Sequence, residues 1–199
     1  RDEAVCQQRG IIDRFSEVLG NISMYIVILT FFVGFGNVVL RYIGRFVGAR
    51  LTSNLFIELQ WYLYSLIFFF GFAYILKHGI NVRVDFWFAN QSRKTQAWID
   101  LVGHLVALIP FCLLGIWATW DPILYSWGLR PDGSWGTWEL SPDPSGLPRA
   151  PIKTMILLAF FSLLLQGFSE LIKLVAILRD QDDLVADLVA EMDAPIRIE

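Results

Sequence analysis

The chain is poor in the residue types on which most catalytic and metal sites depend. Its 199 residues include only two histidines and two cysteines, and none of their spacings is typical of a metal site. Cys6 lies in a polar segment and Cys112 in a long apolar run. We therefore expect no disulfide and interpret both as small packing residues. No phosphate-binding loop, HExxH motif or nucleophile–base spacing is found. These absences predict a protein that is not an enzyme and that has no metal or other cofactor.

Charge is also scarce. Charged residues make up 18% of the chain and the net charge is −3, so nothing indicates nucleic-acid binding. Hydrophobic residues reach 55% and aromatic residues 15%, a composition typical of an integral membrane protein. The first apolar run, residues 18–40, is not followed by a small-residue cleavage site. It is therefore interpreted as a membrane anchor rather than a cleaved signal.

Four long runs have little or no charge. The most informative lies between Glu58 and Lys77, where 18 consecutive residues are uncharged. A helix of that length spans roughly 27 Å, close to the hydrocarbon thickness of a bilayer, and it is apolar on every face. The sequence predicts an all-α integral membrane protein of one domain, residues 1–199, with four transmembrane helices and interfacial amphipathic segments. The spans are expected at about residues 18–40, 58–77, 100–120 and 152–178, and Pro110 is expected to kink the third.

The connecting segments differ in character. Apolar residues at helical spacing in 11–19 predict an amphipathic lead-in at the membrane surface. Residues 42–57 suit either an interfacial segment or an extension of the flanking helices. Residues 121–153 are rich in turn formers and in tryptophan, which suits the headgroup level. The acidic tail, residues 179–199, fits either a docking amphipathic helix or a frayed solvated one.

The basic residues predict an orientation. If both termini are cytoplasmic, ten of the 16 Lys and Arg residues lie inside and six outside, in the sense of the positive-inside rule. We therefore expect both termini in the cytoplasm.

A few polar residues near the spans are candidates for function. Asp100 and His104 are four residues apart on one helix face, which fits a proton relay, a local helix-end hydrogen bond or a subunit contact. Glu58 fits a coupling-ion ligand, a group that caps or orients the second span, or a partner for an arginine of the first connector.

Gln166, Glu170 and Lys173 lie on one face of the fourth span. Glu170 and Lys173 can pair at a spacing of three, either as an interface or boundary pair or as part of an ion site. Four spans without an inverted repeat or broken midplane helices do not make a complete transporter.

Two groups of motifs carry a resemblance. The first is Glu58-x-x-Trp61 with Gly71-x-Ala73-Tyr74, followed at residues 79–85 by Gly-Ile-Asn-Val-Arg-Val-Asp. The second comprises residues 138–141, 146–153 and 164–167. Over residues 10–178 the chain resembles the small membrane subunit of tripartite ATP-independent periplasmic (TRAP) transporters, the DctQ-like family, in its mannitol/chloroaromatic-type branch. The family often has a histidine where this chain has Asn81.

The resemblance implies a three-part importer of the bacterial inner membrane. A periplasmic solute-binding protein would capture a carboxylate-bearing solute, a large permease subunit would carry it with sodium, and the small subunit would brace the permease among membrane lipids. Arg83 and Asp85 would fix the cytoplasmic loop, and a further set would serve structure or subunit contact. That set is Glu58, Trp61, Asp100 and Glu170.

The family leaves ion and substrate sites to the large subunit, so we assign none to this chain. Two alternatives stay open. One is an accessory subunit recruited to another membrane complex through the same four-helix surface, and the other is a stand-alone channel or membrane enzyme.

Overall fold

The structure is a computed structural model that describes residues 2–80, 88 and 90–179. This part of the chain is helical and contains no strand beyond one isolated bridge between Leu129 and Trp135. In chain order the elements are α1 (Asp2–Val47), α2 (Asn54–Lys77), α4 (Arg93–Gly103), the π-helix η1 (His104–Leu108), α5 (Ile109–Ser126) and α6 (Ala150–Leu178).

The described residues include four helical stretches long and apolar enough to cross a membrane. They are Gly10–Val47, Asn54–Lys77, Arg93–Ser126 and Ala150–Leu178. The predicted fold class, an all-α protein with four transmembrane helices, is confirmed.

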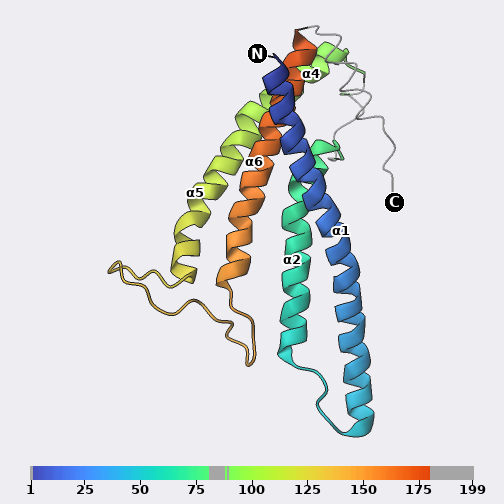
Figure 1. Cartoon of the computed structure of the whole chain (residues 1–199), viewed down its shortest axis with the longest axis vertical. Helices are drawn as coiled ribbons and strands as arrows, with labels where there is room; N and C mark the ends of the chain where they lie inside the picture. Colours follow the sequence, from blue (N-terminus) through green and yellow to red (C-terminus); the bar gives the residue numbers. More distant parts are fainter. Residues whose placement is uncertain (1, 81–87, 89, 180–199) are drawn as a thin grey trace.

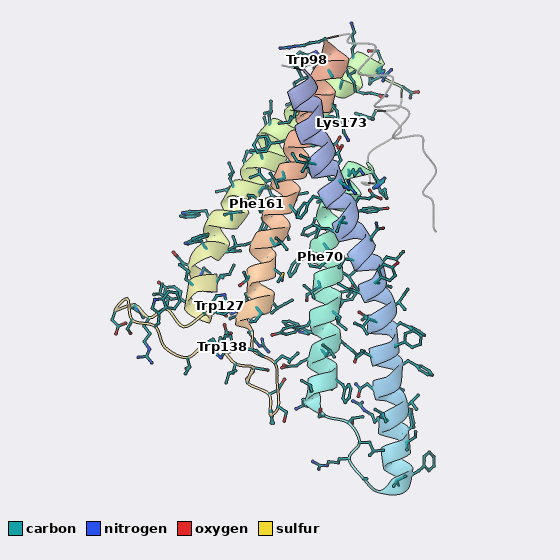
Figure 2. The ribbon with its side chains drawn as sticks, viewed as in Figure 1. Phe70, Trp98, Trp127, Trp138, Phe161 and Lys173 are labelled. Atoms are coloured by element: carbon teal, nitrogen blue, oxygen red, sulfur yellow. The ribbon has the colours of Figure 1, made fainter. Side chains whose placement is uncertain are left out.

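The helices form two antiparallel pairs, α1 with α2 and α5 with α6 (Figure 1). The pairs meet at the end where α1 crosses α6 and separate toward the end that carries residues 48–53 and 127–149 (Figure 1). Trp127 and Trp138 lie at the separated end, and Lys173 lies at the end where the pairs meet (Figure 2). Both connectors therefore lie on one side, as four spans require.

α1 is longer than its uncharged run. Its 46 residues extend about 69 Å at ~1.5 Å per residue, well beyond a bilayer core of about 30 Å. The predicted lead-in and first span are thus one unbroken helix. Over the lead-in, Asp13 and Ser16 are buried, whereas Ile11 and Val18 are exposed. The polar face of this segment packs against protein, and its apolar face is turned outward.

Small and polar side chains bring α1 close to α2. A Cβ placed on Gly20 would lie 2.1 Å from Cδ2 of Tyr74, so only glycine admits the ring there. The Ser23 hydroxyl donates to the carbonyl oxygen of Ile67 at 3.1 Å. These are the contacts that helix association in lipid uses, because lipid chains offer no hydrophobic drive between helices.

The helical run that contains the predicted third span is longer than the expected range of residues 100–120. It forms one continuous helical run from Arg93 to Ser126, and a π-helical turn ends at Leu108, two residues before Pro110. A proline removes a backbone donor from the helical ladder, and such irregular turns accommodate that loss. Phe111 packs edge-on against Phe160 of α6, with ring centroids 5.6 Å apart.

Candidate functional site

Six polar side chains from α1 and α6, five of them buried, form a group that we call the α1–α6 polar cluster. All lie near the end where the two helices cross. Its members are Asp13, Ser16, Gln166, Ser169, Glu170 and Lys173.

Gln166 is the centre of the cluster and is fully buried. Its amide oxygen accepts a hydrogen bond from the Ser16 hydroxyl at 2.7 Å. Its amide nitrogen donates to Asp13 Oδ1 at 3.0 Å and to Glu170 Oε1 at 3.1 Å. Ser169 adds a donor to Asp13 Oδ1 at 2.8 Å. The amide thus has hydrogen-bond partners for both of its polar atoms, as a buried side chain of this kind requires.

Lys173 supplies the positive charge of the cluster. Its Nζ lies 2.7 Å from Glu170 Oε1 and 3.8 Å from Asp13 Oδ2. The side chains of Lys173 and Asp13 are only 10% and 4% exposed. An ion so far from water is tolerated only when it is paired and hydrogen-bonded. The cluster therefore joins α1 to α6 through contacts that would be costly to break.

Sequence reasoning found three of the four α6 members of this cluster and neither of the two α1 members. Asp13, Ser16 and Ser169 were not among the predicted residues. A signal for them exists, because small and polar residues recur at helical spacing on both helices. The positions are 13, 16, 20 and 23 on α1 and 162, 166, 169 and 173 on α6. Such stripes are typical of helix–helix contacts in membranes.

Glu58, in the first turns of α2, holds residues 127–149 against the helix. Its carboxylate accepts hydrogen bonds from the Ser141 hydroxyl and from the backbone N–H of Leu147. Tyr62, one turn further along α2, donates to the carbonyl oxygen of Pro148. The pairing with an arginine of the first connector was one of three alternatives for Glu58. A loop hydroxyl and a loop amide bind the carboxylate instead.

A second carboxylate, Glu139, closes the same loop onto the ends of α5 and α6. It accepts from the Ser126 hydroxyl at 2.7 Å and pairs with Lys153. Its backbone N–H donates to the carbonyl oxygen of Ser126 at 2.8 Å. The hydrogen bonds from Lys153 and Ser126 hold the pKa of the Glu139 carboxyl below its ordinary value of 4.5. Gly128, with φ of +101°, lets the chain reverse before Glu139.

Aromatic side chains lie beside these anchors. The guanidinium of Arg149 lies 5.6 Å from the ring centroid of Trp61, a cation–π distance. Trp127 donates its indole N–H to Thr154 Oγ1 at 2.8 Å, and its ring lies 5.7 Å from that of Trp138 (Figure 2). Trp61 therefore contacts the segment that leads into α6. Residues 127–149 are fastened to α2, α5 and α6.

The imidazole of His104 contacts the backbone of Asp100. His104 Nδ1 lies 2.7 Å from the carbonyl oxygen of Asp100, one turn before the π-helix. Its Nε2 is buried and has no hydrogen-bond partner in the described residues. The geometry is that of a local helix hydrogen bond, with the Asp100 carboxylate taking no part in it.

The remaining predicted residues lie outside the part of the chain that the structure describes. These are Arg83 and Asp85, together with Asn81 and the tail from residue 180. Within the described residues, no group of three His, Cys, Asp or Glu side chains is placed to hold a metal ion. Cys112 is buried and free.

The fold and these contacts define a class. The chain is a multi-pass membrane protein whose buried polar side chains join its own helices and loop. The family model described as "Tripartite ATP-independent periplasmic transporters, DctQ component" matches residues 30–177. The chain belongs to this family, as the sequence motifs predicted. It is a component of a transporter rather than an enzyme, and it is a multi-pass protein of the bacterial inner membrane. Searches of curated proteins and of solved structures each found no match.

Proposed function

We propose that this chain is the non-catalytic scaffold subunit of a sodium-coupled importer of carboxylate-bearing solutes, and that it braces the large permease subunit. The observation that carries the proposal is the α1–α6 polar cluster. Its carboxylates, amide and ammonium group bind one another across two helices. Groups used in this way stabilise an arrangement of helices.

The outward surface supports the same role. Large apolar side chains project from α1 and α5, among them Phe31, Phe35, Phe111 and Trp117, each more than half exposed. In a membrane such faces are covered by lipid tails or by another apolar helix. Lipid tails are as apolar as these side chains, so the hydrophobic effect does not favour a partner helix over lipid. A partner helix binds instead through close packing, which small residues allow. A four-helix chain whose α1 and α6 are joined by polar contacts and whose outer faces are apolar suits a brace for a larger membrane subunit.

The tripartite family supplies the other partners of the proposal, a large permease subunit and a periplasmic solute-binding protein. Sodium coupling and a carboxylate solute follow from the resemblance of the motifs around Glu58 and Trp61 and of residues 79–85. In this arrangement the solute-binding protein selects the solute, the permease carries it, and this chain holds the permease in place.

Co-purification tests the bracing role. The tagged chain and an untagged large subunit from the same operon would be co-expressed and extracted in a mild detergent. We expect a stable complex of the two. We also expect Gln166→Leu, which removes the amide at the centre of the polar cluster, to lower the yield of this complex. As a control, Ser65→Ala removes a hydroxyl whose hydrogen bond stays within one helical turn. Recovery of the chain with a different membrane assembly would contradict the proposal.

We also propose that both termini face the cytoplasm. In a background of Cys6→Ser and Cys112→Ala, a membrane-impermeant maleimide would be applied to intact spheroplasts. Ser134→Cys, in the exposed loop, should be labelled directly. Ser92→Cys, at the opposite end, should be labelled only after lysis. The reverse pattern would invert the orientation.

A further inference from the structure

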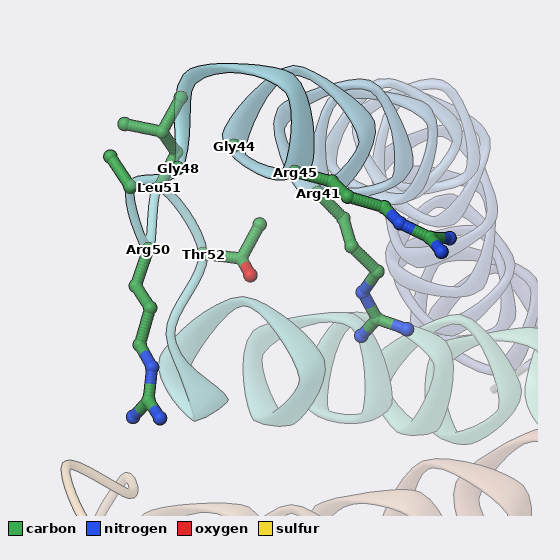
Figure 3. Close-up of a pocket in the computed structure, with 8 residues that line it drawn as sticks. Arg41, Gly44, Arg45, Gly48, Arg50, Leu51 and Thr52 are labelled. Atoms are coloured by element: carbon green, nitrogen blue, oxygen red, sulfur yellow. The ribbon is translucent and has the colours of Figure 1, made fainter.

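A cavity of about 330 Å³ lies where α1 ends and the chain turns into α2. Its volume is at the lower end of the range of roughly 300–1,000 Å³ that small-molecule sites occupy. The cavity is lined by residues of the last turns of α1 and the connector (Figure 3). They are Arg41, Gly44, Arg45, Gly48, Ala49, Arg50, Leu51 and Thr52.

The turn that shapes this cavity depends on two glycines. Gly48 has a φ of +73°, a left-handed conformation that side chains disfavour. The N–H of Ala49 donates to the carbonyl oxygen of Gly44 at 3.0 Å. A Cβ on Gly44 would lie 2.5 Å from the carbonyl oxygen of Ala49. The hollow therefore follows from the way α1 ends.

Three arginines line the cavity and make its rim positively charged. Arg41 and Arg45 lie on the side of α1, and Arg50 lies across the opening (Figure 3). All three are exposed, and no described acidic side chain forms an ion pair with them. Residues 41–57 contain no Asp or Glu. The next acid, Glu58, is engaged by Ser141 and Leu147.

The backbone beside the cavity adds to this field. α2 begins at Asn54, its N-cap Ser53 makes no side-chain capping bond, and its first turn holds no acidic residue. The positive end of the α2 dipole is thus left uncompensated by side chains next to Thr52. Arg45, in the last turn of α1, stabilises that helix end. That role does not account for Arg50 on the far side of the hollow.

The surroundings of the cavity are strongly apolar. Phe46 is 89% exposed and Val47 is 70% exposed, and Tyr42, Leu51 and Leu55 are exposed as well. A ligand that fits this surface carries an anionic group for the guanidinium groups and hydrocarbon for the neighbouring side chains. Guanidinium groups bind phosphate oxygens in a bidentate manner. We propose that the cavity binds the phosphate headgroup of an anionic phospholipid, whose acyl chains lie along the exposed side chains of α1 and α2.

Native mass spectrometry of the full chain tests this proposal. The delipidated protein would be titrated with dioleoylphosphatidylglycerol, with dioleoylphosphatidylcholine and with inorganic phosphate. We expect the first lipid to bind about tenfold more tightly than the zwitterionic one, from the charge of the three arginines. We expect the variant Arg41→Gln/Arg45→Gln/Arg50→Gln to lose this preference. The charge-matched variant Arg14→Gln/Arg93→Gln/Arg179→Gln, which changes three exposed arginines elsewhere, should keep it.

A measurement on the unmodified chain keeps the test independent of folding defects in a variant. A photoreactive phosphatidylglycerol, with its reactive group near the glycerol, should crosslink to peptides that cover residues 41–57. Equal binding of the two lipids, or crosslinks confined to other helices, would overturn the proposal. So would inorganic phosphate that displaces the anionic lipid at equal concentration, since the site would then bind a free anion. Binding of the solute-binding protein to the three arginines in the absence of lipid would also overturn the proposal.

Discussion

Ser169 donates a hydrogen bond of 2.8 Å to the carboxylate of Asp13, although 156 residues separate them in the chain. The bond joins the first described helix to the last. It lies beside the ion pair of Lys173 with Glu170, so the first and last described helices are fastened to each other at this point.

Lys173→Met should destabilise the fold. The change leaves the half-buried carboxylate of Glu170 and the buried carboxylate of Asp13 without their ammonium partner, and losing one member of a buried pair costs roughly 3–5 kcal/mol. The measurement is the free energy of unfolding in mixed detergent micelles. The double variant Glu170→Gln/Lys173→Met should recover part of the loss, because it removes the unpaired charge. A single variant as stable as the wild type would show that the pair does not hold α6 in place.

Gly20→Ala should separate α1 from α2. The new methyl group would fall 2.1 Å from the Tyr74 ring, and overpacking of this kind costs about 1–3 kcal/mol. Gly36→Ala is the matched control on the same helix, because nothing lies within 4 Å of its Cβ position. That change should be neutral or stabilise α1 by up to about 1 kcal/mol through helix propensity. Thermal unfolding of both variants decides the matter, and equal effects would contradict the close α1–α2 contact.

The contacts of the Glu139 carboxylate with Ser126 and Lys153 should weaken at acidic pH. Its pKa is lower in the folded protein than the ordinary value of 4.5, so the stability it contributes is complete above that value. The contribution is lost as the pH falls through the folded pKa. Hydrogen exchange of the Glu139 amide, which is bonded to Ser126, should quicken below pH 4.5, after correction for intrinsic rates. Glu139→Gln should remove this pH dependence, and identical profiles for variant and wild type would assign it to another group.

Arg83→Ala and Asp85→Ala should weaken assembly more than solute recognition. The resemblance implies that these two residues fix the cytoplasmic loop, while the solute is selected elsewhere. The yield of the complex with the large subunit should fall, and the KM of uptake by the complex that does form should stay near the wild-type value. An unchanged yield with a raised KM would assign these residues to the transport path.

The number of helices and the family could be predicted from sequence because both depend on local signals. Uncharged runs such as residues 59–76 indicate the membrane-spanning helices. The motifs around Glu58 and Trp61 indicate the family. The ends of the helices were less predictable. α1 passes through Asp13 and Arg41 without a break, because those charged residues lie on a helix that extends beyond the hydrocarbon.

Contacts between distant segments could not be predicted. Gln166, Glu170 and Lys173 were found on one face, and the polar stripe on α1 indicates a helix contact, but nothing local indicates that Asp13 meets these three residues from 150 or more residues away. For Glu58, an arginine of the first connector was one of the alternatives that the sequence left open. The structure places a serine and a backbone amide of an irregular loop there, and the conformation of such a loop is set by tertiary contacts.

Reconstitution in liposomes tests the scaffold role most directly. Sodium-driven solute uptake would be measured with the solute-binding protein present and three membrane compositions: this chain alone, the large subunit alone, and both together. We expect uptake only when both membrane subunits are present, and we expect Gln166→Leu to reduce it in proportion to the loss of complex. Sodium-driven uptake by this chain alone would contradict the account, as would full activity of the large subunit without it.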